Sequence, residues 1–255
     1  MEILNNITLL TCTFNNNLLT KCMIMSLFKQ LGKSIPVVIM DNGTKEFCTN
    51  DMKEIFTVID NTNYKIIPNY KQVSRNHCAS IDYALKNYIK TKYVLLCDND
   101  ILFKSSIKKL FNDLNILNEI DSVGEIELSK RGYRLFPFFC IINVEKMKLD
   151  KINYFDKNNC MNNMETKFDT NGNYESNIYL TKNIKGLDTG GSFLNEIKNK
   201  KWTILKIKLD KYIKHFAMAS WNPKVKNNIY IWLKINESLF KYDRNRRNRI
   251  SNRAN

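Results

Sequence analysis

The sequence predicts an α/β fold with a mostly parallel central sheet flanked by helices and a smaller mixed region in the second half. Two observations lead to this prediction. Short, continuous apolar runs recur at 7–14, 36–40 and 93–97, the pattern of strands buried on both faces. Between them lie segments of helical length with apolar residues at helical spacing. Strands that alternate with helices in this way pair in parallel.

The N-terminal half alternates strands and helices. We expect strands at 7–14, at 36–40, within 57–67 and at 93–97, and helices at 18–31, 46–56 and 73–89. The first helix is expected to end at Gly32, a residue type common just after helices. The Asn42-Gly43 pair after the second strand could also form a hairpin turn, but the helical length of 46–56 favours the alternation.

After residue 100 the pattern is less regular. We expect helices at 107–117, 192–198 and 228–240, and strands at 133–144 and 202–209. Pro137 predicts that its strand is an edge strand or contains a bulge, because proline cannot donate to a sheet ladder. Residues 150–177 are rich in Asn, Asp and Lys, which predicts a mobile loop.

Size and composition bound the class of protein. A chain of 255 residues with 44% hydrophobic content can bury an ordinary core. No run approaches 18 apolar residues, and 7–14 is too short for a signal peptide, so we expect a soluble, cytoplasmic chain without a transmembrane segment. The seven cysteines are scattered without Cys-X-X-Cys spacing, which predicts reduced, buried side chains.

The net charge of +15 is compatible with an anionic partner, whether nucleotide, nucleic acid or lipid surface, and the abundance of Lys, Asn and Ile is equally typical of an AT-rich genome. Most of the basic residues are lysines spread along the chain. Five of the eight arginines lie within the last 12 residues, at positions 244, 246, 247, 249 and 253. A solvated, low-complexity tail is the alternative interpretation of that segment.

The most informative residues are two carboxylates directly after the strand at 93–97. Residues two apart on an extended chain point the same way, so Asp98 and Asp100 can direct their oxygens at one point. Two hard oxygen ligands suit Mg²⁺ or Mn²⁺, and open α/β sheets bind ligands beyond the carboxyl ends of their strands. The alternative is a polar turn in which Asp100 or Ser105 caps the next helix.

Taken together, these segments resemble the GT-A nucleotide-sugar glycosyltransferases, in particular the family 2-like members. The resemblance rests on Thr13-Phe14-Asn15, Asp41-Asn42-Gly43, Ser74-Arg75-Asn76 and the Asp98-Asn99-Asp100 (DXD) motif. It covers residues 7–105, and 130–221 only loosely. The family usually has Ala-Arg-Asn-X-Gly at the helix entrance, where this chain has Ser74 and Cys78.

The resemblance implies a GT-A, Rossmann-like domain over 1–221. Residues 1–105 would form its nucleotide-binding half and 106–221 its acceptor half, with a C-terminal amphipathic helix and Arg-rich tail at 222–255. The implied activity is transfer of a hexosyl or pentosyl group from a nucleoside-diphosphate sugar to an acceptor hydroxyl.

The resemblance also implies roles in the donor site. Asp41 would receive the base or ribose, with a turn-forming aspartate as the alternative, and Thr13 and Asn76 would line the same site. Arg75 would lie near the diphosphate, with a surface salt bridge as the alternative. Of the acidic pair, Asp98 would contact ribose and metal, and Asp100 would ligate Mn²⁺ or Mg²⁺ directly.

Two later residues complete this set. Asp188 lies in a glycine-flanked loop, where inverting members place the aspartate that deprotonates the acceptor; helix capping at Thr189 or Ser192 is the alternative. His215 resembles the late histidine that completes the metal site in some members, with a structural histidine as the alternative. His77 is predicted to lie on a helix away from the strand ends.

The acceptor is not specified by any motif. The excess of basic over acidic residues suggests a polyanionic acceptor. This could be modified DNA, or a glycan or lipid-linked glycan at an anionic membrane face. Two other classes stay open: a nucleotidyltransferase of similar fold and a non-catalytic nucleic-acid-binding module. A nucleotidyltransferase should have a glycine-rich phosphate loop after the first strand, and Asn15-Asn16-Asn17 is not one.

Overall fold

The structure is a computed structural model. It describes residues 3–14, 16–42, 56–60, 73–117, 120–129, 132–156, 164–168, 174–179, 187, 189–216 and 223–235.

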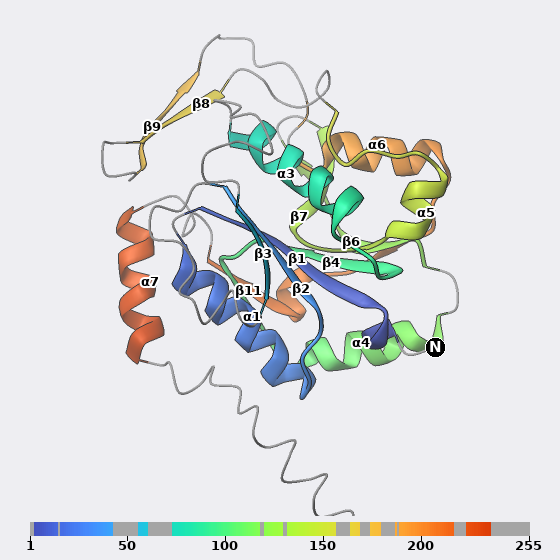
Figure 1. The fold of residues 1–255 in the computed structure, drawn as a ribbon, viewed down its shortest axis with the longest axis horizontal. Coiled ribbons are helices and arrows are strands. Elements are labelled where there is room, and N and C mark those ends of the chain that lie inside the picture. The colour runs from blue at the N-terminus through green and yellow to red at the C-terminus, as the bar shows by residue number, and fades with distance from the viewer. Residues whose placement is uncertain are drawn as a thin grey trace, which may run out of the picture.

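A seven-stranded sheet forms the centre of the molecule, in the order β10-β6-β7-β4-β1-β2-β3 (Figure 1). Its strands are β1 (Ile7–Thr13), β2 (Val37–Asp41), β3 (Thr57–Asp60), β4 (Tyr93–Cys97), β6 (Ser122–Ser129), β7 (Gly132–Asn143) and β10 (Ile204–Lys206). Strand β7 runs antiparallel to both of its neighbours, and all other pairs in this sheet are parallel. The predicted fold class, a mostly parallel sheet flanked by helices, is confirmed.

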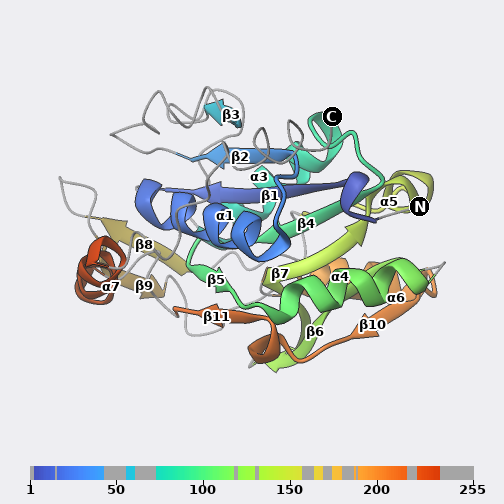
Figure 2. The same cartoon turned by 90° about the horizontal axis from the view of Figure 1, so that it is seen from below.

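Helices cover both faces of the sheet (Figures 1 and 2). On one side lie α1 (Asn17–Leu31) and α4 (Ser106–Ile116), and on the other α3 (Val73–Asn87), α5 (Val144–Leu149) and α6 (Gly191–Asn199). The alternation of side chains along each strand explains this. Leu9 and Leu95 belong to the core under α1 and α4, whereas Leu10 and Leu96 belong to the core under α3 and α6.

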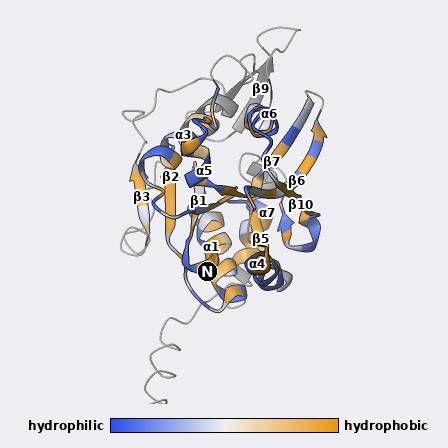
Figure 3. Cartoon of the chain, turned by 90° about the vertical axis from the view of Figure 1, so that its right-hand side faces the viewer, coloured by the Kyte–Doolittle hydropathy of each residue, from blue (hydrophilic) through white to orange (hydrophobic). Residues whose placement is uncertain are grey.

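Smaller elements surround the sheet. Strand β5 (Ile101–Phe103) pairs antiparallel with β11 (Ile213–His215), and β8 (Met164–Phe168) pairs antiparallel with β9 (Tyr174–Tyr179). Two short 3-10 helices are η1 (Ile3–Asn5) and η2 (Leu209–Lys211), and helix α7 (Pro223–Ile235) packs beside α1. Figure 3 shows β2 and β3 coloured largely hydrophobic, and every residue of β2 is buried in the sheet.

Three predictions about these elements are corrected or left open. Residues 150–177 are not a loop throughout, because they contain β8 and most of β9. Pro137 does not lie in an edge strand, because the unpredicted β6 pairs along the outer side of β7. The bulge alternative holds, since the β6–β7 register shifts between Gly124 and Ile126, beside Pro137. The helix predicted at 46–56 lies outside the described residues except for its last position.

The cysteines in the described part of the chain are buried thiols, as predicted; they are Cys12, Cys22, Cys78, Cys97 and Cys140.

Candidate functional site

Polar side chains gather at the carboxyl edge of the sheet. Strand β1 ends at Thr13, which lies opposite Asp41 at the end of β2, and β4 ends at Cys97, just before Asp98. These three strands are parallel, so their C-terminal ends meet at one edge. Thr13 and Asp41 are both buried. The end of β2 is also tied to α3, because the Ser80 hydroxyl donates a 2.8 Å hydrogen bond to the side-chain oxygen of Asn42.

The residue between the two acids is fixed by a buried hydrogen-bond network. Asn99 donates from Nδ2 to Oγ1 of Thr13 at 3.4 Å and to Oγ1 of Thr20 at 3.3 Å. The Thr20 hydroxyl lies 3.1 Å from Thr13 Oγ1 and donates to the Asn16 carbonyl at 3.0 Å. Since Thr20 belongs to α1, this network holds the Asn99 side chain toward α1.

Asp98 faces helix α3, where it meets a histidine. His77 Nε2 lies 3.5 Å from Asp98 Oδ1, and the two side chains are about a quarter exposed. The prediction that His77 lies away from the strand ends is therefore wrong. The sequence predicts the helix but contains no signal for how its early turns lie over the end of β4.

Asp100 meets the second histidine. His215 Nε2 lies 3.4 Å from Asp100 Oδ1, and the Asp100 side chain is 3% exposed. The pairing of β11 with β5 brings them together, because it sets His215 opposite Ile101, and the Phe216 amide donates to the Asp100 carbonyl at 2.8 Å. The Phe138 ring stacks on the imidazole at a centroid distance of 4.1 Å.

The two acids and two histidines form one electrostatic unit. Burial raises the pKa of Asp98, His77 lowers it, and the charge of Asp100 raises it further. For His215, burial by itself lowers the pKa, but the hydrogen bond and charge of Asp100 outweigh it, so the pKa of His215 is raised. At Asp98, burial and the neighbouring acid therefore outweigh the histidines, whereas at His215 the acids outweigh burial.

Arg134 is a neighbour of this site that the sequence analysis missed. Strand β7 continues past the end of β4, since Phe139 is the residue opposite Cys97. On this extension Arg134 forms a salt bridge with Glu127 of β6, with Nη2 2.9 Å and Nε 3.1 Å from Oε2. Its positive charge lowers the pKa of both Asp98 and His215. Nothing in the local sequence marks it, because it lies within an ordinary β-prone run.

The remaining predicted site residues are only partly described. Arg75 and Asn76 lie in α3, but their side chains fall outside the described residues, as does Asp188. The neighbours of Asp188 are described: the Gly190 carbonyl accepts from the Leu135 amide at 3.4 Å.

The helix-capping alternatives find little support. The N-cap of α6 is Gly190, which has no side chain to cap with, and Ser105 makes no side-chain capping bond at the start of α4.

The candidate metal donors occur as two carboxylate–imidazole pairs. Within the described residues, no three His, Cys, Asp or Glu side chains are grouped closely enough to hold a metal ion. Asp98 Oδ1 is nevertheless buried and accepts no hydrogen bond from any described group. A buried carboxylate oxygen of this kind fits a cation ligand, and carboxylate oxygen with imidazole nitrogen suits Mn²⁺. The residues present thus fit a divalent ion in their chemistry.

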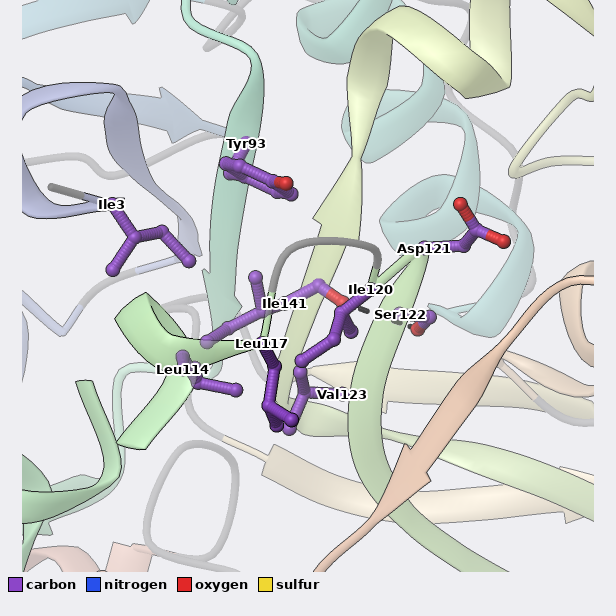
Figure 4. Close-up of a pocket in the computed structure, with 9 residues that line it drawn as sticks. All are labelled: Ile3, Tyr93, Leu114, Leu117, Ile120, Asp121, Ser122, Val123 and Ile141. Carbon is purple, nitrogen blue, oxygen red and sulfur yellow. Dashed lines mark hydrogen bonds between the residues drawn. The ribbon is translucent and has the colours of Figure 1, made fainter. Parts of the chain in front are cut away.

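A small apolar cavity of about 10 Å³ lies at the other end of the sheet (Figure 4). Its lining includes Tyr93 at the start of β4 and Ser122 at the start of β6, together with Leu114, Ile120 and Val123. A cavity of this size has room for about one water molecule. Because it lies at the amino ends of the strands, it is not part of the site at the carboxyl edge.

Within the described part of the chain, no helix combines the length and apolar character needed to cross a bilayer.

Comparison with known proteins gives structural likenesses only. No family model and no curated protein matches the chain. Similar solved structures include S. aureus TarS, at 13% identity and a TM-score of 0.41, covering 59% of this chain and 50% of that one. The galactosyltransferase LgtC, in complex with donor and acceptor sugar analogs, is 16% identical with a TM-score of 0.38, covering 56% and 59%. The bifunctional glycosyltransferase WbbM is 10% identical with a TM-score of 0.44, covering 80% and 39%.

The chain thus spans about half the length of the TarS structure. At these identities and TM-scores the likeness is partial, and the function is inferred below from the residues at the sheet edge.

Proposed function

We propose that this chain is a metal-dependent glycosyltransferase that moves a sugar from a nucleoside-diphosphate donor to an acceptor hydroxyl. The observation that carries the proposal is the presence of two carboxylate–imidazole pairs, Asp98 with His77 and Asp100 with His215, at the carboxyl edge of the sheet. His215 follows Asp100 by more than a hundred residues, yet its Nε2 lies 3.4 Å from Asp100 Oδ1. Carboxylates that pair with imidazoles at this edge are suited to bind a charged nucleotide through a cation.

In this proposal Asp98, Asp100 and His215 would hold Mn²⁺ or Mg²⁺, and the ion would offset the negative charge of the departing diphosphate. Arg75 contributes a permanent positive charge to the same diphosphate. Thr13, Asp41 and Asn76 line the donor site, with Asp41 toward the base or ribose. The burial of Thr13 and Asp41 at adjacent strand ends supports this arrangement.

Asp188 is proposed as the base that removes the proton of the acceptor hydroxyl, so that the sugar is transferred with inversion. A carboxylate needs only hydrogen-bond reach and an ionised state for this role. One contact of the adjoining loop supports it. The Cys78 thiol donates to Thr189 Oγ1 at 3.5 Å, and Cys78 follows His77 on α3, so this loop adjoins the helix that faces Asp98.

The experiment that tests the proposal uses Asp100→Asn, which keeps the shape of the side chain and removes its charge. We expect wild-type protein to release nucleoside diphosphate from a sugar donor in the presence of Mn²⁺, and Asp100→Asn to lose at least about a hundredfold of this rate. Asp113→Asn, an exposed carboxylate on α4, is the matched control and should keep full activity. Full activity in Asp100→Asn would contradict the proposal.

A thermal-shift panel of nucleoside diphosphates distinguishes the remaining classes. A glycosyltransferase should be stabilised by uridine or guanosine diphosphate, and more so with Mn²⁺ present. Release of pyrophosphate from a nucleoside triphosphate would instead indicate a nucleotidyltransferase. Duplex DNA that stabilises the chain while no nucleotide does would indicate a nucleic-acid-binding module.

A further inference from the structure

Helix α7 carries two large apolar side chains that face solvent. Ile231 is 59% exposed and Trp232 is 41% exposed. The next residue, Leu233, is 1% exposed and packs with Leu19 and Cys22 of α1. The helix therefore already has a packed face, and the exposed pair lies outside it. Two adjacent exposed residues of this size on a helix that also has a buried face indicate an interaction surface.

A lysine lies beside this pair. Lys214 Nζ is 5.8 Å from the centroid of the Trp232 ring and 5.3 Å from that of Phe216, and the two rings are 6.3 Å apart. An indole next to an ammonium group on a long aliphatic stem is typical of surfaces at a membrane interface, where each side chain has an apolar part and a polar end. Ile231, Trp232, Lys214 and Phe216 are called the α7 patch below.

The sequence that follows α7 carries a net positive charge, as Lys214 does. Residues 236–255 contain six basic residues, Lys241 and Arg244, Arg246, Arg247, Arg249 and Arg253, against two acidic residues, Glu237 and Asp243. Basic segments next to an amphipathic helix are attracted to anionic lipid headgroups. The positive charge of residues 236–255 therefore suits an anionic lipid surface, as the α7 patch does.

We propose that the α7 patch docks on the surface of an anionic lipid bilayer. Ile231 and Trp232 enter the headgroup region, while Lys214 and the basic C-terminal residues contact lipid phosphates. A nucleic acid would also satisfy the cations and could stack on Trp232, but it would gain nothing from the exposed Ile231. Removal of that side chain from water is a contribution that a bilayer supplies.

The patch adjoins the candidate site. In Figure 1, α7 lies at the end of the sheet where β1 passes into α1. Phe216 of the patch follows His215 directly, and its amide donates to the Asp100 carbonyl. Docking would therefore bring the carboxyl edge of the sheet close to the bilayer. If the proposed transferase activity holds, an acceptor carried on a lipid would reach the site without leaving the membrane; the docking itself does not depend on that activity.

The test measures binding of the full chain to vesicles of phosphatidylglycerol mixed with phosphatidylcholine by sedimentation. Ile231→Asp should lower the partition coefficient by about tenfold or more, since it replaces the aliphatic side chain that would enter the headgroup region with a charged one. Ile116→Asp is the matched control: Ile116 is 78% exposed but lies on α4, away from α7 in Figure 1, and its variant should bind like wild type. Circular dichroism checks that both variants are folded.

A second readout follows Trp232 directly. Brominated phosphatidylcholine in the same vesicles should quench the fluorescence of the wild-type protein more strongly than that of Trp232→Phe. Equal quenching, or vesicle binding by Ile231→Asp that equals wild type, would overturn the proposal. So would tighter binding of duplex DNA than of vesicles at physiological salt. Donor turnover in vesicle-free solution is measured in parallel, so a failure of the transferase proposal is seen separately.

Discussion

At the scale of single residues, the site holds carboxylate groups in buried positions, where charged groups are rarely found. Asp98 Oδ1 is buried without a hydrogen bond from the described residues, and Asp100 is 3% exposed. Buried carboxylates are costly for the folded state unless a partner offsets the charge. Here each carboxylate has an imidazole within 3.5 Å. Such an arrangement lowers the stability of the folded state but holds the charged groups in fixed positions, as is common at functional sites.

This reasoning predicts that Asp98→Asn is more stable than wild type at neutral pH. Burial raises the folded-state pKa of Asp98 above its unfolded value, so ionisation opposes folding, and stability is lost as pH rises through the folded pKa. Asparagine does not ionise. In the presence of a chelator, the unfolding midpoint should therefore rise by a few degrees at pH 7, and the gain should shrink as pH falls toward about 4, near the ordinary aspartate pKa.

Thermal unfolding of both proteins at several pH values measures the difference. Asp82→Asn is not a suitable control, because Asp82 accepts from the Tyr154 amide at 2.8 Å. The exposed Asp113 serves better, and Asp113→Asn should show little change across the range. An Asp98→Asn variant that is less stable than wild type at pH 7 would show that the histidines more than offset the cost of burial.

At the scale of elements, short segments far apart in sequence position the site. Strand β11 carries His215 to Asp100, and the loop before α6 is held against β7. Among the described glycines, Gly190 lies closest to another part of the backbone. It has a φ of 83°, and a Cβ at this position would lie 2.2 Å from the Leu135 carbonyl oxygen. Only glycine fits such a close approach of two backbones.

We therefore predict that Gly190→Ala destabilises the protein by about 3 kcal/mol, from both the left-handed conformation and the contact with Leu135. Gly32→Ala is the control for the conformation alone. Gly32 has a φ of 72°, but a Cβ there meets nothing within 4 Å, so we expect a cost of about 1 kcal/mol. Chemical denaturation measures both. Equal losses in the two variants would mean that the loop moves away from β7 without penalty.

At the scale of the whole molecule, one sheet joins the two halves of the chain. Strand β4 lies between β1 from the N-terminal side and β7 from beyond residue 130. The pairing of β4 with β7 spans Tyr93–Cys97, the full length of β4. The strand that leads to the acidic pair is thus central only when the second half is present.

A fragment of residues 1–105 is accordingly predicted not to fold alone. It would expose one edge of β4 and the apolar side chains that β7 covers, including those opposite Phe139 and Ile141. Circular dichroism and the heat-capacity signal of thermal unfolding test this. The full chain should unfold in a single transition through this sheet, whereas a cooperative transition in the fragment would show that its strands form an independent unit.

The sequence alone was sufficient for the fold class and for most of the elements around β1, β2 and β4, because apolar runs and helical spacing are local patterns. It also predicted the acidic pair at a strand end. Only the tertiary structure decided which side chains meet there. His77 lies beside Asp98 because α3 packs against this edge of the sheet, and His215 reaches Asp100 because β11 pairs with β5, more than a hundred residues away in sequence. Contacts of that range depend on how the elements pack, and local patterns of residues do not contain that information.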